Sequence, residues 1–173
     1  MKQIFESDRI SFVEVSECLV NDYLTMANDY ENVNRFIGGK KKAFTAEQEV
    51  QWVREKLEEK ALVFSMIDKS NGRFIGNIEL MDPSDFEGEL GIAITGEMQD
   101  QGYGTEVVLA IVKYAIDQLK LKRVFLRTNP QNAGAIRVYG KCGFRKYKQD
   151  SEHVYEELKA YYEEYKAHMK RMK

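Results

Sequence analysis

Two glycines at a fixed distance from a glutamine are the first residues of this sequence that could do chemistry. Gln99, Gly102 and Gly104 form the pattern Gln-x-x-Gly-x-Gly, and a long stretch with apolar residues at helical spacing follows. The first turn of a helix has backbone N–H groups without partners, and the helix dipole adds partial positive charge there. Glycine leaves the backbone open to a ligand. The segment therefore predicts an anion site for a phosphate at a helix N-terminus.

The same glycines fit other kinds of loop, which the neighbouring residues help to separate. A dinucleotide-binding fingerprint needs a third glycine three residues after Gly104, where Val107 stands. A P-loop needs Gly-Lys followed by Ser or Thr, and the sequence has no such tripeptide. Glycine pairs also cap or turn a chain without binding a ligand, and the pattern alone leaves that alternative open.

A second segment adds a more specific pattern. It reads Asn129-x-x-Asn132-x-x-Ala135-Ile136-x-x-Tyr139-x-x-x-Gly143-Phe144. Together with the glycine segment, it resembles the two hallmark stretches of the GCN5-related N-acetyltransferase (GNAT) superfamily, including their separation by one helix and one strand. The resemblance is firm from Arg73 to Phe144. The start, Arg9 to Trp52, resembles more loosely the branch with ribosomal-protein N-terminal acetyltransferases and spermidine acetyltransferases.

The resemblance implies acetyl-CoA as a co-substrate. In the family, the strand before the glycine segment splays from the next strand, and the pantetheine arm pairs with its backbone. Asn132 would bond the pantetheine amides, or serve only as a helix N-cap, and the two roles can coexist. Gln99 stands where Arg is as frequent in the family. The strand residues implied are Ile92, Ala93 and Ile94, and the pyrophosphate would lie on the backbone of Gln101, Gly102, Tyr103, Gly104 and Thr105.

The resemblance also implies the reacting groups. The Tyr139 hydroxyl would protonate the thiolate that leaves when an amine attacks the thioester; the alternative is that Tyr139 only packs in the core. Glu79 and Glu89 are candidate bases, or solvated strand residues. An amine must be neutral to attack, which at pH 7 costs roughly 4–5 kcal/mol for a lysine-like amine and about 1 kcal/mol for an α-amino group. A base therefore matters more for a polyamine than for a protein N-terminus.

The elements that must position these residues follow from hydrophobic periodicity and turn residues. An antiparallel run of strands comes first, and a β-α-β-α order follows, which predicts a mixed sheet in one α/β domain over residues 1–173. Thr45 and Gln48 fit a capping box at a helix start. The expected strands are Arg9 to Val15, Ala61 to Ile67, Arg73 to Met81, Glu89 to Thr95 and Arg123 to Thr128, and the expected helices begin at Ser16, Thr45, Gly104 and Asn132.

The end of the chain fits two patterns. From Glu152 to Lys173 there is no Gly or Pro, and apolar residues recur at helical spacing, yet alternate residues also fit one face of a strand. Local propensity favours a helix. The resemblance favours a closing β-hairpin after Phe144, although no obvious turn residue stands after Gly143. We expect the hairpin.

Composition narrows the partners. The net charge of −2 gives no footprint for nucleic acid. Two histidines and two distant cysteines are too few for a structural metal site, and Cys142 fits a half-buried thiol better than a nucleophile. No signal peptide or membrane-length apolar run occurs, so we expect a cytoplasmic protein. The basic run Lys40 to Lys42 fits a solvated loop or a phosphate contact.

The sequence thus predicts an α/β chain with the GNAT fold, a mixed and mostly antiparallel sheet with a central splay, flanked by helices. The predicted activity is acetyl transfer from acetyl-CoA to a primary amine: a protein N-terminus, a polyamine or another small amine. A homodimer is common in the family. Two alternatives stay open: a non-catalytic module that holds an acyl-CoA, and an unrelated nucleotide protein with a glycine loop.

Overall fold

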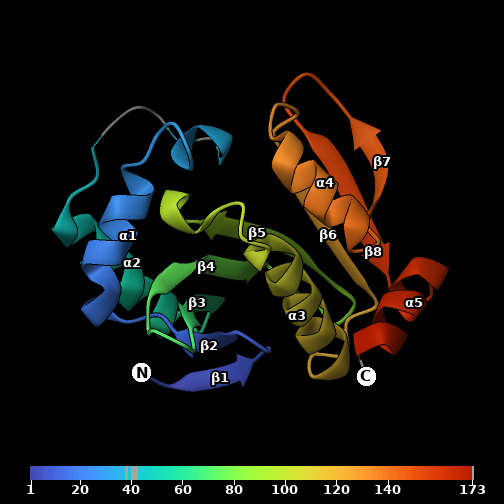
Figure 1. Ribbon diagram of the computed structural model, residues 1–173, viewed down its shortest axis with the longest axis horizontal. Helices are drawn as coiled ribbons and strands as arrows, with labels where there is room; N and C mark the ends of the chain where they lie inside the picture. The colour runs from blue at the N-terminus through green and yellow to red at the C-terminus, as the bar shows by residue number, and fades with distance from the viewer. Residues whose placement is uncertain (38, 40–42, 173) are drawn as a thin grey trace. The chain divides into compact units, whose positions relative to one another are not determined.

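The computed structural model describes residues 1–37, 39 and 43–172, so the predicted contact of Lys40 to Lys42 lies outside the described residues. The strands are hydrogen-bonded in the order β1-β2-β3-β4-β5-β6-β8-β7, and helices flank them (Figure 1). This is the α/β fold with a mixed sheet that the sequence predicts. Two compact units are present: residues 1–79 with 92–101, and residues 80–91 with those from 102 onward. We call them unit 1 and unit 2 and describe each by itself.

Unit 1 holds the antiparallel strands of the first half of the chain. β2 pairs with β3 from Ile10 opposite Asp68 to Glu14 opposite Phe64. Among the strands of this unit, β1 was not expected from the sequence, because it is a short edge strand near the first residue. The elements are β1 (Gln3–Glu6), β2 (Ile10–Glu14), β3 (Leu62–Asp68), the first part of β4 (Phe74–Met81), the last part of β5 (Glu87–Ile94), α1 (Val20–Ala27), α2 (Ala46–Glu58), and the 3₁₀ turns η1 (Glu17–Leu19), η2 (Asn34–Phe36) and η3 (Gly96–Met98).

The core of unit 1 lies between its helices and strands. Val53 of α2 is fully buried, and Tyr23 of α1 is 1% exposed. The Tyr23 hydroxyl shares a hydrogen bond of 2.6 Å with Ser65 of β3. The capping box is confirmed, since Thr45 N donates to Gln48 Oε1 and Gln48 N donates to Thr45 Oγ1.

Unit 2 holds the parallel pair and the closing hairpin. β5 runs parallel to β6, with backbone pairs only from Glu87 opposite Arg123 to Glu89 opposite Phe125. β8 lies antiparallel between β6 and β7. Besides parts of β4 and β5, the elements are α3 (Tyr103–Asp117), β6 (Arg123–Thr128), α4 (Ala133–Lys141), β7 (Arg145–Gln149), β8 (Val154–Lys159) and α5 (Glu163–Met172).

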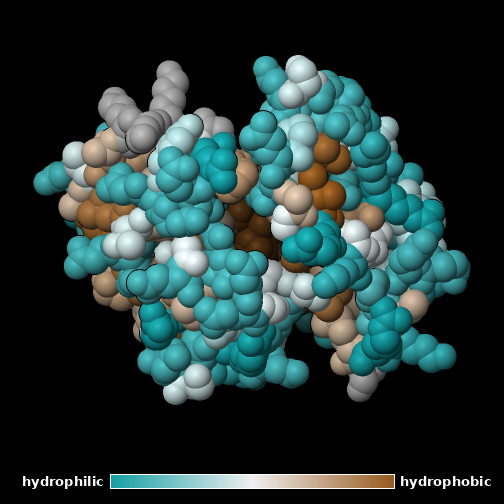
Figure 2. All heavy atoms as spheres, turned by 45° about the horizontal axis from the view of Figure 1, so that its top comes forward, coloured by the Kyte–Doolittle hydropathy of each residue, from teal (hydrophilic) through white to brown (hydrophobic). Residues whose placement is uncertain are grey.

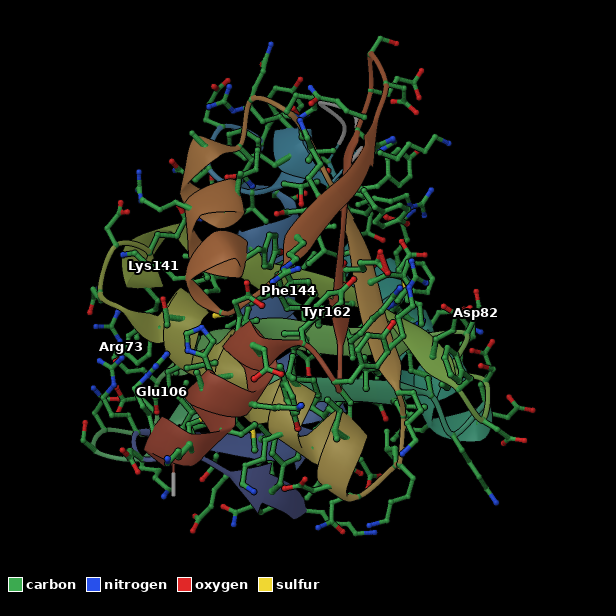
Figure 3. The ribbon with its side chains drawn as sticks, turned by 90° about the vertical axis from the view of Figure 1, so that its right-hand side faces the viewer. Arg73, Asp82, Glu106, Lys141, Phe144 and Tyr162 are labelled. Atoms are coloured by element: carbon green, nitrogen blue, oxygen red, sulfur yellow. The ribbon has the colours of Figure 1, made fainter. Side chains whose placement is uncertain are left out.

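One face of the β6–β8 pair is buried. α4 lies over these strands in both ribbon views (Figures 1 and 3), and α3 contacts α4. Burial alternates along both strands, which is the period of a half-buried sheet. The six buried side chains of this face are Val124, Leu126, Thr128, Val154, Glu156 and Leu158.

The expected hairpin is confirmed, and a helix follows it. β7 and β8 pair around a turn in which Asp150 Oδ1 accepts hydrogen bonds from the backbone N–H groups of Glu152 and His153. An aspartate can build a turn without glycine, so the search for an obvious turn residue was wrong here. The chain is helical only from Glu163 onward, in α5. Near its start, Tyr162 packs under the Arg145 guanidinium at 4.6 Å.

One face of the molecule is mostly polar. On the face drawn in Figure 2, hydrophilic side chains cover most of the surface and hydrophobic ones show in a few places. Among the described residues, no helix is long and apolar enough to span a membrane.

Candidate functional site

The glycine segment forms the N-terminus of α3 in unit 2. Gly102 is the residue before the helix, with φ 80° and ψ 1°, a left-handed conformation that glycine adopts without strain. Gly102 has no side chain with which to cap this end. The backbone N–H groups of the first helical turn therefore follow a glycine, at a position that favours an anion.

Gln99 has a local structural role that the sequence did not reveal. In unit 1, its Nε2 donates to the Ile94 carbonyl at 2.9 Å and to the Asn32 carbonyl at 3.0 Å. Gln101 Nε2 donates to the Glu97 carbonyl at 2.8 Å. Both glutamine side chains thus fix the chain between β5 and α3. Because the partners of Gln99 lie up to 67 residues away, only the fold could identify them.

The β5 segment predicted to pair with pantetheine, Ile92 to Ile94, lies at the end of the strand in unit 1. Its side chains are half-buried. Gly76 on β4 permits a close approach there, since a Cβ at that position would lie 2.0 Å from the Ala93 carbonyl oxygen. A glycine inside the predicted strand Arg73 to Met81 is the sequence signal for this contact.

Asn132 is the N-cap of α4, because its Oδ1 accepts a hydrogen bond from Ala135 N at 3.2 Å. Asn132 therefore does act as a helix N-cap, and this role uses only its amide oxygen. At the other end of the helix, the buried Cys142 Sγ lies 3.8 Å from the Thr105 carbonyl. Within unit 2, this contact brings the end of α4 beside the first turn of α3.

Tyr139 lies near the end of α4 and is 6% exposed. Its ring packs against Phe144 with centroids 5.8 Å apart. Burial raises the pKa of the Tyr139 phenol, and the negative charge of Glu156 and the neighbouring Cys142 raise it further. The raised pKa keeps the phenol protonated, so it can serve as a proton donor.

The two carboxylates predicted as bases are both held by cations. Glu79 Oε1 lies 2.7 Å from Lys56 Nζ in unit 1. Glu89 Oε2 accepts a hydrogen bond of 2.8 Å from Arg127 Nε in unit 2. Each carboxylate thus has one oxygen held by its cationic partner.

Two buried polar groups of unit 2 were missed by the sequence analysis. Thr128 Oγ1 and Glu156 Oε2 are buried and have no hydrogen-bond partner. They share the buried face of the β6–β8 pair. The pattern Val154-x-Glu156-x-Leu158 would have placed Glu156 inward if the segment had been read as a strand. Among the described residues, no cluster of three or more His, Cys, Asp or Glu side chains could hold a metal ion.

Comparison with known protein families identifies the family of this chain. Residues 9–145 match the family model described as the acetyltransferase (GNAT) domain. The chain belongs to the GNAT family. The resemblance inferred from the two motif segments is thereby confirmed.

Similar proteins carry the same assignment. The probable N-acetyltransferase YjcK of Bacillus subtilis (strain 168) is 34% identical over 125 residues, which are 69% of this chain and 63% of that protein. The chain thus matches under two thirds of that GNAT relative. The apo structure of FdhC, a nucleotide-linked sugar GNAT, has a TM-score of 0.82 at 16% identity over 99% of this chain and 97% of that one. Spermidine N-acetyltransferase from Vibrio cholerae, in complex with CoA and spermine, has a TM-score of 0.76 at 15% identity over 87% and 94%.

Proposed function

We propose that this GNAT protein transfers the acetyl group of acetyl-CoA to a primary amine. The observation that carries the proposal is the N-terminus of α3 behind the left-handed Gly102, within a chain that matches the GNAT domain from residue 9 to residue 145. A phosphate needs backbone N–H donors and partial positive charge, and this helix end offers both. The residues present therefore fit the pyrophosphate of the co-substrate.

Each predicted contact has a role in holding acetyl-CoA. The backbone from Gln101 to Thr105 binds the pyrophosphate, and the amide of Asn132 bonds the pantetheine arm. The backbone of Ile92, Ala93 and Ile94 pairs with that arm as an added strand would. Gln99 acts indirectly, because its side chain bonds the Ile94 carbonyl and fixes the end of β5.

The chemistry needs an acid for the leaving sulfur and a base for the amine. The neutral amine attacks the thioester carbonyl carbon, the C–N bond forms, and the C–S bond breaks. Tyr139 donates a proton to the departing thiolate, and the proton that the nitrogen loses as the amide forms returns to the Tyr139 oxygen. Glu79 or Glu89, acting through water, removes a proton from the arriving ammonium, which becomes a neutral amine.

The acceptor is a primary amine on a small molecule or a peptide. Among similar structures, one protein is bound to spermine and another is described as acting with nucleotide-linked sugars. These ligands are properties of those two proteins. For this chain they set the panel of acceptors that must be tried.

The test is release of free CoA thiol from acetyl-CoA across that panel. It holds peptides with different N-termini, spermidine, a lysine-rich peptide, an aminoglycoside and an amino sugar nucleotide. Acceptor-dependent release with one class is expected, and a reaction without acceptor measures background hydrolysis. Binding of acetyl-CoA without transfer to any acceptor would instead favour a non-catalytic acyl-CoA module.

A further inference from the structure

A series of hydrogen bonds in unit 1 leads from the core to Asn77 on β4. The backbone N–H of Ser16 donates to the Tyr23 hydroxyl at 3.2 Å. Tyr23 shares its bond of 2.6 Å with Ser65, and the Ser65 hydroxyl donates to Asn77 Oδ1 at 2.8 Å. Tyr23 and Ser65 are buried, whereas Asn77 is half-buried. We call these four residues the Tyr23 network.

The direction of each bond in the Tyr23 network follows from which groups can donate. The Ser16 N–H only donates, so the Tyr23 oxygen accepts there and the Tyr23 O–H is given to Ser65. If the Asn77 amide were reversed, its Nδ2 would donate to Ser65, and Ser65 would donate to Tyr23. The Tyr23 O–H would then meet the Ser16 N–H, donor against donor. Asn77 Oδ1 therefore faces Ser65, and the Nδ2 hydrogens point away from Ser65.

The rest of the core holds the network in place. The Tyr23 ring packs edge-on against Trp52 of α2, with centroids 5.5 Å apart, and against Phe74 of β4 at 5.6 Å. A buried network whose donors and acceptors are matched fixes its members in one arrangement. Asn77 thus presents N–H donors in a fixed orientation rather than an amide that turns freely.

The neighbours of Asn77 in unit 1 belong to the predicted site. Gly76 lies so close to the Ala93 carbonyl that a Cβ there would be 2.0 Å from its oxygen, and Ala93 is part of the segment predicted to pair with pantetheine. Glu79, a candidate base, lies on the same face of β4 as Asn77, because alternate strand residues share a face. Lys56 Nζ holds Glu79 Oε1 at 2.7 Å. An amide donor and a carboxylate therefore lie in one row beside the predicted pantetheine segment.

This row suits an acceptor with two kinds of atom. Two residues along a strand are about 7 Å apart, and a hydrogen bond spans about 3 Å at each end. An amine beside Glu79 and an oxygen beside Asn77 therefore fit when only a short link joins them. An oxygen on the carbon next to the amine-bearing carbon gives such a link. The α-amine of a peptide and a 2-amino sugar both carry this oxygen, whereas polyamines and the lysine side chain do not.

We propose that Asn77 determines acceptor specificity by donating its amide N–H to an oxygen on the carbon next to the amine-bearing carbon of the acceptor. Tyr23 and Ser65 act through Asn77 as positioning residues. The inference rests on the proposed function and deepens it, because it narrows the primary amine to an amino-carbonyl or amino-alcohol compound. A site that hydrogen-bonds one group of its substrate discriminates against molecules without that group.

Three probe acceptors test the substrate class with the wild type. Glycinamide carries the oxygen as a carbonyl, glucosamine carries it as a hydroxyl, and spermidine has no oxygen. Acetyl transfer to glycinamide or glucosamine is expected with a higher kcat/KM than transfer to spermidine, and the better of the two identifies the source of the oxygen. A preference for spermidine would overturn the inference and leave the proposed function intact. A protein that acetylates no amine at all would contradict the proposed function.

Asn77→Leu tests the residue itself with the preferred probe. The variant should raise KM for that acceptor by about tenfold, since one hydrogen bond to the bound acceptor is lost. Its kcat, and its acetyl-CoA affinity measured by calorimetry, should stay near the wild-type values. Asn21→Leu, which changes an exposed asparagine of α1, is the matched control and should keep the wild-type KM. An unchanged KM in Asn77→Leu would overturn the inference.

A double-mutant cycle tests the positioning role of Tyr23. Tyr23→Phe removes the O–H that sets the direction of the network, so the KM for the preferred probe should rise while the acetyl-CoA affinity is kept. In an Asn77→Leu background, the same change should alter KM less than about twofold, because both residues act on one hydrogen bond. Equal rises of KM in both backgrounds would show that Tyr23 does not act through Asn77.

Discussion

Arg127 Nε donates a hydrogen bond of 2.8 Å to Glu89 Oε2, and Arg127 lies two residues beyond Phe125, which pairs with Glu89 in the last backbone pair of β5 and β6. Backbone pairing of the two strands stops at Glu89 and Phe125, and the side-chain pair continues the link where the backbones no longer bond. The pair is part exposed, so its effect on stability is small. Its larger effect is on Glu89, whose carboxylate it orients.

The role of Glu89 can be separated from the role of its ion pair. If Glu89 serves as the first base, Glu89→Gln should lower kcat/KM for a polyamine at pH 7 by about 10²-fold. The loss for a peptide α-amine should be smaller, because that amine is more often neutral at pH 7. Steady-state kinetics with both acceptors measure the difference.

Arg127→Met is the matched control, since it breaks the same pair and keeps the carboxylate. It should retain most of the activity on both acceptors. Equal losses in the two variants would mean that the ion pair, and not proton transfer by Glu89, is what the enzyme needs.

Tyr139→Phe tests the acid. Removing the hydroxyl should lower kcat by about 10²-fold or more, because the thiolate then leaves without a proton donor. Acetyl-CoA affinity, measured by calorimetry, should stay near the wild-type value. Tyr161→Phe, which alters an exposed tyrosine, serves as the control. An unchanged kcat in Tyr139→Phe would make Tyr139 a packing residue against Phe144.

Gly104 tests the placement of the pyrophosphate. Gly104→Asp should abolish acetyl-CoA binding, because its carboxylate would face a phosphate at the α3 N-terminus. Gly104→Asn has nearly the same size without the charge, so it should bind more tightly than the aspartate variant. Calorimetry measures both affinities. If the two variants bind equally well, the phosphate does not lie at this helix end.

The two cysteines should differ in reactivity. Cys142 is buried, and burial raises its pKa to about 12, whereas Cys18 is exposed. Only the thiolate reacts, so one thiol per native chain should react quickly with a disulfide reagent at pH 8. The second should react after unfolding in guanidinium. Cys18→Ser should remove the fast phase, and a fast phase that survives this change would contradict the assignment.

The sequence predicted what local patterns decide. The capping box of Thr45 and Gln48, the strand Arg123–Thr128 and the glycine turn before α3 were all readable, because each depends on neighbours in the chain. The role of Gln99 was not, because its partner Asn32 is brought to it only by the fold.

The C-terminal segment is a second case in which local sequence patterns could not decide the structure. An apolar residue at every fourth position fits a helix and also fits every second position of a strand, so Val154 and Leu158 could not decide between them. Pairing of β8 with β6 decided it, and thereby turned Glu156 inward. Charge at a buried strand position can be recognised only once the strand itself is known.

The buried Glu156 should also leave a signature in stability. Its pKa is raised in the folded chain, so the folded chain binds this proton more tightly than the unfolded chain does. The stabilisation is complete below the unfolded pKa of about 4.3, and it is lost as the pH rises through the folded pKa. Glu156→Gln cannot lose a proton. As the pH rises through this window, the unfolding free energy of Glu156→Gln should therefore increase relative to that of the wild type. Above the window, the difference between the two proteins should stay constant.

Urea unfolding of both proteins at pH values from 4 to 8 measures this difference, with Glu152→Gln as the control that should show none. A difference that does not change with pH would mean that Glu156 binds its proton equally well in the folded and unfolded chain, and the burial argument would then be wrong.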